Sequence, residues 1–103
     1  MDRRLKLDSE LREFMGLTGH VYFQPPPSYK LEYDCIIYEQ SNGKTDFAAN
    51  MPYNFTKKYN LTLITRDPDT PLVEELAMHF PMIVMDRAYT ADNLNHYAFT
   101  LYY

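Results

Sequence analysis

The sequence feature that most constrains the fold is an alternating run, YNFTKKYNLTLITR, over positions 53–66. Aromatic or aliphatic residues occupy positions 53, 55, 59, 61 and 63, and polar residues occupy most of the positions between them. Successive side chains of a β-strand point to opposite faces, so the pattern predicts a strand with one buried and one wet face. At ~3.3 Å per residue the run would extend roughly 40 Å, about three times the radius of gyration expected for 100 residues. We therefore expect its early half to reach outside the body, where an open strand edge is a template for association.

Composition predicts one globular domain over residues 1–103, because the chain is 46% hydrophobic and long enough to bury a core. The N-terminal sequence MDRRLKLD has no apolar segment after its charges, so we expect no secretory signal and synthesis in the cytoplasm. The net charge of -4 argues against binding nucleic acid by neutralising phosphates. Ten tyrosines and six methionines favour contacts with other proteins.

Two helices are expected, each with one apolar face. The first runs from Arg3 to Met15 and is stopped by Gly16. The second follows Thr70 as N-cap and Pro71 at the first helical position, and ends at Pro81. Their apolar stripes are Leu7, Leu11, Phe14 and Met15 in the first helix, and Val73, Leu76, Ala77 and Phe80 in the second.

Four further segments are assigned to the sheet by apolar runs or alternation. They are His20 to Gln24, Lys30 to Glu39, Met82 to Asp86 and Asn95 to Tyr103, with a polar loop at 87–93. In the second segment, the residues expected to share one face are Leu31, Tyr33, Cys35 and Ile37. Cys35 is expected to point into the core. The expected fold class is α+β, with an antiparallel or mixed sheet of about four to five strands packed by two helices, in the order α-β-β-β-α-β-β.

Residues Gln40 to Pro52 are predicted to form a long loop, and long loops in small domains often make functional contacts. We expect residues 40–53 to contact partners, together with the start of the alternating strand and the tyrosines that end the chain. The candidate interface residues are Phe47, Met51, Tyr53, Phe55, Tyr102 and Tyr103. The sequence PPSY at 26–29 also matches the short PPxY motif bound by WW-type modules.

No catalytic, cofactor-binding or metal-binding residues are predicted. The single cysteine excludes internal disulfides and multi-cysteine metal sites, and the three histidines show no metal-ligand spacing. There is no glycine-rich phosphate loop and no GxSxG motif. The acidic residues at 67, 69, 74 and 75 lack the pattern of a calcium-binding loop. The sequence therefore favours a protein that is not an enzyme.

Four segments carry a resemblance to a known family: VYFQPP at 21–26, CIIYE at 35–39, YNLTLITRDPD at 59–69 and DRAYTADNLNH at 86–96. With the order of elements, they resemble the tail terminator (tail completion) proteins, small neck proteins of long-tailed bacteriophages. The resemblance implies a virion protein that forms a homohexameric ring on the last ring of the tail tube. Such a ring halts tube polymerisation, binds the tail tube protein and the head completion (stopper) protein, and lets DNA pass through its lumen without specific binding.

Three alternatives stay open. The chain could be another neck component, either a stopper, an adaptor or a tube-like protein; adaptors are largely helical and stoppers more purely β. It could be a small adaptor module that binds one host protein through Pro25 to Tyr29 or through residues 40–53. An enzyme would need a site built from Cys35, a histidine and an acid.

Overall fold

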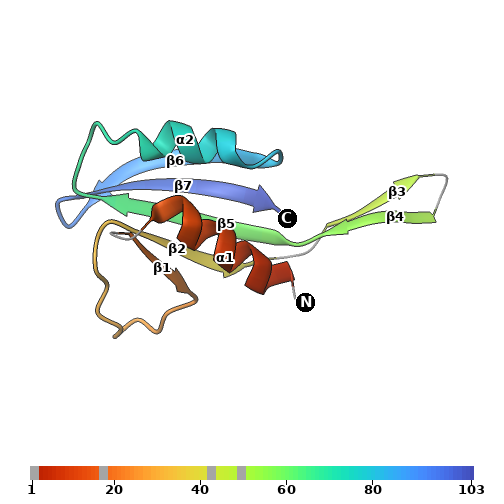
Figure 1. Cartoon of the computed structure of the whole chain (residues 1–103), viewed down its shortest axis with the longest axis horizontal. Helices are drawn as coiled ribbons and strands as arrows, with labels where there is room; N and C mark the ends of the chain where they lie inside the picture. Colours follow the sequence, from red (N-terminus) through yellow and green to blue (C-terminus); the bar gives the residue numbers. More distant parts are fainter. Residues whose placement is uncertain (1–2, 17–18, 42–43, 49–50) are drawn as a thin grey trace.

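The computed structural model describes residues 3–16, 19–41, 44–48 and 51–103. Two helices and seven strands follow one another along this part of the chain (Figure 1). Their bounds are α1 (Arg3–Met15), β1 (His20–Phe23), β2 (Cys35–Gln40), β3 (Lys44–Ala48), β4 (Met51–Thr56), β5 (Lys58–Thr65), α2 (Leu72–His79), β6 (Ile83–Ala91) and β7 (Leu94–Tyr102). The predicted order of elements is confirmed, with β3 added and the long strand divided in two.

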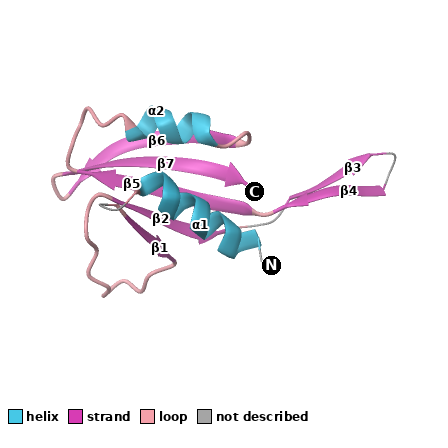
Figure 2. Ribbon diagram, viewed as in Figure 1, coloured by secondary structure: helices cyan, strands magenta, loops and turns pink. Residues whose placement is uncertain are grey.

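Five strands form one mixed sheet in the order β1-β2-β5-β7-β6. Strands β1 and β2 are parallel, and every other neighbouring pair in this sheet is antiparallel. Both helices lie on the same face of the sheet, and the core fills the space between these layers (Figure 2). The fully buried side chains of this core include Leu7, Leu11, Ile36, Tyr38, Tyr59, Leu61, Leu63, Leu76 and Leu101. The predicted α+β class, a sheet packed by two helices, is therefore confirmed.

The alternating run over 53–66 forms two strands, β4 and β5, with Lys57 between them. In β5 the side chains of Tyr59, Leu61 and Leu63 are buried, as the odd-position pattern predicted. Strand β4 pairs with β3, and this hairpin extends beyond the sheet, so that the molecule measures 49 × 24 × 24 Å (Figure 1). The reach outside the body is confirmed, but the projecting strand is paired within its own chain. The predicted long loop at 40–52 is wrong, since its described part contains β3 and the start of β4.

The prediction for β2 is wrong at its start and in its choice of inner face. The strand begins at Cys35 rather than Lys30. Ile36 and Tyr38 belong to the core against the helices, so Cys35 and Ile37 alternate to the opposite face. The predicted strand residues Leu31 and Tyr33 lie in the preceding loop. Cys35 is fully buried as expected, although on the face away from the helices.

Helix α1 ends where the sequence places its stop. Gly16 has a φ of +75°, the left-handed conformation that glycine adopts without a Cβ clash, and its amide bonds to the Arg12 carbonyl at 3.0 Å. At the start of α2, the Thr70 hydroxyl accepts a hydrogen bond from the Leu72 amide at 3.3 Å, and Pro71 already has helical angles. Gly16 therefore ends α1, and Thr70 and Pro71 begin α2, as the sequence predicted.

The expected polar loop at 87–93 is wrong, because β6 continues to Ala91 and pairs with β7 along its length. Asp92 and Asn93 both have positive φ, 53° and 62°, as the central residues of a type I′ turn do. Asp and Asn tolerate this conformation better than most residues. One β-bulge, between Met85 and Arg87, interrupts the pairing.

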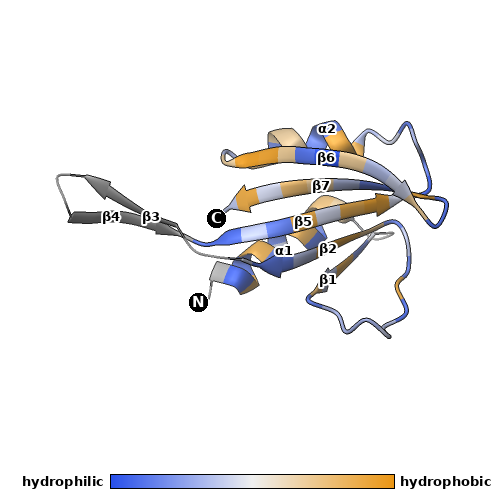
Figure 3. Ribbon diagram, turned by 180° about the vertical axis from the view of Figure 1, so that it is seen from behind, coloured by the Kyte–Doolittle hydropathy of each residue, from blue (hydrophilic) through white to orange (hydrophobic). Residues whose placement is uncertain are grey.

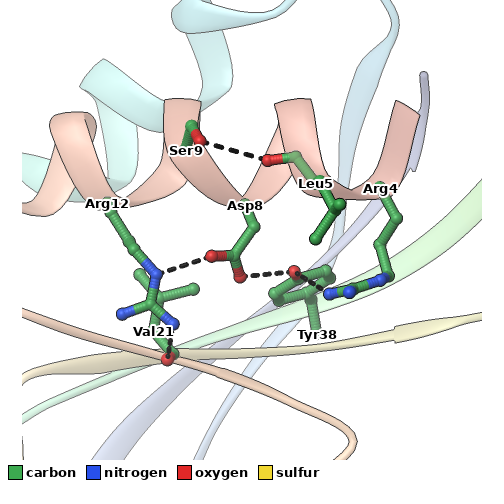
Figure 4. A network of polar contacts seen from close by, with 7 residues as sticks. All are labelled: Arg4, Leu5, Asp8, Ser9, Arg12, Val21 and Tyr38. Carbon is green, nitrogen blue, oxygen red and sulfur yellow. Dashed lines mark hydrogen bonds and ion pairs between the residues drawn. The ribbon is translucent and has the colours of Figure 1, made fainter. Parts of the chain in front are cut away.

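Polar contacts around Tyr38 join α1 to the sheet (Figure 4). Asp8 accepts hydrogen bonds from the Tyr38 hydroxyl and from Arg12 Nε, each at 2.6 Å. Arg12 also donates to the Val21 carbonyl at 3.2 Å, and Arg4 donates to the Tyr38 hydroxyl at 3.4 Å. The network therefore connects one face of α1 to both β1 and β2.

This network shifts the pKa values of two side chains, Tyr38 and Asp8. Burial and the bond to Asp8 raise the pKa of the Tyr38 hydroxyl well above its ordinary value. Burial acts to raise the pKa of Asp8, but the bonds from Tyr38 and Arg12 together outweigh it and lower that pKa. At neutral pH the folded state therefore holds an ionised Asp8 against a protonated phenol.

We expect Asp8→Asn to lower the free energy of unfolding at neutral pH by about 1–3 kcal/mol, because it removes a charged hydrogen-bond acceptor. A lowered folded-state pKa gives stability that is present above the unfolded carboxyl pKa of about 3.9 and lost as pH falls through the folded value. The difference in free energy of unfolding between the wild type and Asp8→Asn should therefore disappear in acid. Urea unfolding at several pH values measures this gap, with the exposed Glu13→Gln as control on the same helix. A gap independent of pH would contradict the assigned role of Asp8.

Candidate interaction surface

The projecting β3–β4 hairpin is the first candidate surface. It continues the β2–β5 pair beyond the five-stranded sheet. At that end of the pair, the Ser41 amide, just after β2, donates a 2.7 Å hydrogen bond to the Lys58 carbonyl of β5. At its base, the backbones of Lys57 and Tyr103 bond to each other in both directions, at 3.3 and 3.0 Å. Within the described residues, β3 and β4 pack chiefly on each other (Figure 1). An isolated two-stranded hairpin is at best marginally stable in water, so this one is expected to gain from a partner.

Four of the six predicted interface residues lie on this hairpin. Phe47 is on β3, and its backbone lies opposite Pro52; Met51, Tyr53 and Phe55 are on β4. Residues that the sequence placed partly in a loop and partly in a strand are thus brought onto one projecting element. The alternation pattern predicted β4. The residues of β3 show no such pattern, so the sequence did not predict that they form a strand paired with β4.

The other two predicted interface residues, Tyr102 and Tyr103, lie near the base of the hairpin. Tyr102 pairs with Lys58, and its amide also bonds to the Met82 carbonyl at 3.0 Å. Tyr103 packs against the core, with its ring centroid 6.0 Å from that of Phe80. Both are therefore held by their own sheet, and Tyr103 contributes to the body of the domain.

The outer edge of β6 is a second surface, which the sequence analysis missed. Strand β6 is the last strand of its sheet, and within the described residues no other strand pairs with its outer side. It is exposed over nearly all of its nine residues. Its first half carries apolar residues, coloured orange in Figure 3, and the side chain of Val84 is 61% exposed. Exposed apolar side chains on α2, just before β6 and in β6 are Met78, Met82, Val84 and Met85.

The sheet face without helices has a shallow hollow of about 290 Å³, lined mainly by polar residues of β2, β5, β6 and β7. Beside it the Arg87 guanidinium lies 4.9 Å from the centre of the Tyr89 ring, which stacks on His96 at 4.8 Å. Asp86 accepts a hydrogen bond from the Thr100 hydroxyl at 2.5 Å. The Tyr89–His96 and Asp86–Thr100 contacts join β6 to β7.

The proline-rich loop from Pro25 to Tyr29 lies beside β1. Two hollows of about 260 Å³ each border it. Tyr29 is 54% exposed, and its ring contacts the ring of Tyr22 edge to face at 5.5 Å. The PPSY segment is thus accessible, but its tyrosine is already partnered within the chain.

Cys35, at the start of β2, belongs neither to the hairpin nor to β6. Its side chain is fully buried, and burial, aided by the Asp34 carboxylate, raises the pKa of its thiol to about 12. Among the described residues, no group of three or more histidine, cysteine, aspartate or glutamate side chains is placed to hold a metal ion. The thiol is thus in its unreactive protonated form at neutral pH.

We expect a thiol-specific reagent to label Cys35 at least about a hundredfold more slowly in the folded protein than in denaturant, because only the exposed thiolate reacts. Absorbance of the released chromophore measures both rates. Stoichiometric labelling of the folded protein at the unfolded rate would mean an accessible, activated cysteine and would revive the enzyme alternative.

Neither helix described by the structure is long and apolar enough to cross a membrane. Comparisons of the chain with protein-family models, curated proteins and solved structures find no significant match.

Proposed function

We propose that this protein is a structural component of a bacteriophage neck, a tail terminator that forms a homohexameric ring at the head-proximal end of the tail tube. The observation that carries the proposal is the β3–β4 hairpin, which projects from a small α+β body and makes the molecule twice as long as it is wide. A projection of this kind needs a partner surface, because two isolated strands are marginal in water and their open edges promote association. A ring of identical subunits supplies that surface repeatedly.

Two further features support a terminator among neck components. Two helices packed on a mixed sheet agree better with the terminators that the sequence resembles than with largely helical adaptors or more purely β stoppers. The net charge of -4 suits a ring whose lumen passes DNA without binding it, since like charges repel. In this proposal one face of the ring binds the tail tube protein and halts its polymerisation. The other face binds the head completion protein, and the ring is a part of the virion.

The solution mass of the purified protein tests this function. Light scattering over a range of concentrations should show a closed assembly with the mass of about six chains of 12.2 kDa. A monomer that forms only a one-to-one complex with a host protein would instead favour the adaptor alternative. Truncation of the Pro25 to Tyr29 loop would then locate that contact.

A further inference from the structure

We propose that neighbouring copies are joined by strand addition: β3 of the projecting hairpin of one copy pairs with the outer edge of β6 of the next. This inference rests on the proposed ring and names the contact that builds it. It brings together two strand edges that no other strand of the described residues pairs with, the outer edge of β3 in the hairpin and the outer edge of the nine-residue strand β6.

Strand β3 is the better edge of the hairpin for such pairing. It contains no proline, so all five of its residues carry a backbone N–H, whereas β4 contains Pro52. Each strand of a two-stranded sheet has one edge that is not used by its partner. The outer edge of β3 therefore lacks no backbone donor, although the register of β3 with β4 shifts between Asp46 and Phe47.

Strand β6 offers a matching edge. Asp92 and Asn93 close the β6–β7 hairpin as a two-residue turn, so Ala91 and Leu94 form its last hydrogen-bonded pair. Antiparallel pairs alternate, so Ala88 and Thr90 fall at non-hydrogen-bonded positions and direct their amides outward. The regular segment after the bulge, 87–91, has the same five-residue length as β3.

Charge and hydrophobicity are also compatible with this contact. The whole chain carries -4, so two copies repel each other in general. The two paired elements are each neutral, however: the hairpin strands carry one lysine and one aspartate, and β6 carries Asp86 and Arg87. Exposed Met82, Val84 and Met85 at the start of β6 supply apolar area near this edge that a docked hairpin would cover, and methionines adapt readily to a partner surface.

The contact joins two different surfaces, so it is heterologous; repeating it forms a ring if the rotation between copies closes, as the proposed function requires, and an open chain if it does not. A contact between two copies of one surface would stop at a dimer. This difference allows the pairing to be tested with two complementary variants, each of which lacks one half of the contact.

The first variant removes the hairpin. Deleting residues 44–57 leaves the sequence Ser41-Asn42-Gly43-Lys58, and Asn-Gly is favoured for a two-residue turn between antiparallel strands. The second variant, Thr90→Pro, removes an outward amide of β6 and leaves its pairing with β7 intact. Thr90→Ala keeps the amide and is the matched control. Circular dichroism and melting temperature check that each variant is folded.

We expect each variant alone to be a monomer, an equimolar mixture of the two to form a one-to-one heterodimer and nothing larger, and Thr90→Ala to assemble as the wild type does. The mixture keeps one intact hairpin and one intact β6 edge, which is enough for a single contact. If Thr90→Pro does not fold, Thr90→Lys replaces it, because a lysine on an edge strand also opposes strand addition.

Rings formed by the hairpin deletion would overturn the docking proposal while leaving the proposed function intact. Absence of a heterodimer from the mixture would overturn it as well. If the wild type forms open chains and the hairpin deletion is monomeric, the docking contact is supported and the closed ring is contradicted. A wild type that is monomeric at every concentration would overturn both.

Discussion

Replacing Phe55 with aspartate should abolish ring assembly and leave a folded monomer. Phe55 lies on β4, in the hairpin that projects from the body, opposite Thr45 of β3. An ionised carboxylate in a subunit contact costs several kcal/mol unless it is paired, whereas an aromatic side chain is a typical anchor of such contacts. A cost of that size weakens association at least about a hundredfold. The change lies on β4, outside the five-stranded sheet that packs on the helices.

The matched control for this change is Thr56→Asp. It adds the same negative charge at the next position of β4 and keeps Phe55. The residue opposite Thr56 in β3 is Lys44, so the new carboxylate does not face a like charge within the hairpin. Light scattering should give the monomer mass of 12.2 kDa for Phe55→Asp and the wild-type mass for Thr56→Asp. Intact rings in Phe55→Asp would show that Phe55 does not contribute to the subunit contact.

Replacing Leu11 with alanine should lower the free energy of unfolding by about 2–5 kcal/mol, because it leaves a cavity between α1 and the sheet. Leu11 is fully buried in the core cluster, whereas Leu5 on the same helix is 47% exposed. The same substitution at Leu5 is therefore the control, with an expected effect within about 0.5 kcal/mol. Urea unfolding followed by circular dichroism measures both values. Equal effects at the two positions would mean that α1 does not pack on the sheet through the face described here.

Sequence patterns predicted those elements whose two faces differ in environment. Helix α1 has its predicted bounds because an apolar stripe that includes Leu7 and Leu11 faces the sheet, and Gly16 ends it. Strand β5 alternates up to Leu63 because one face lies under the helices and the other is partly exposed at Lys58, Asn60 and Thr62. In both elements, the local sequence and the tertiary environment carry the same information.

The patterns failed where the two faces are alike. In β2 four apolar residues follow one another, and Cys35 is as buried as Ile36, so the inner face could not be read from alternation. In β6 nearly every residue is exposed, so the segment after Asp86 resembled a polar loop. Its strand conformation depends on pairing with β7, a contact that periodicity does not record.

The candidate surfaces were predictable only in part. The long alternating run led to β4 and to the expectation of a projecting strand, and four of the proposed interface residues lie on that hairpin. The β6 edge was missed because the turn at Asp92 and Asn93 was read as a loop. An Asp-Asn pair between two runs of similar length is a weak form of the two-residue hairpin signal, and it could have indicated this strand.

Negative-stain electron microscopy of the purified wild-type protein at high concentration tests the central claim most directly. The claim is that the chain forms a closed ring with its projecting hairpin in the contact between subunits. We predict uniform rings of about six subunits with a central opening wide enough for duplex DNA, absent from the Phe55→Asp protein under the same conditions. A field of single compact particles at every concentration would contradict the ring, and with it the proposed place of this protein at the end of a tail tube.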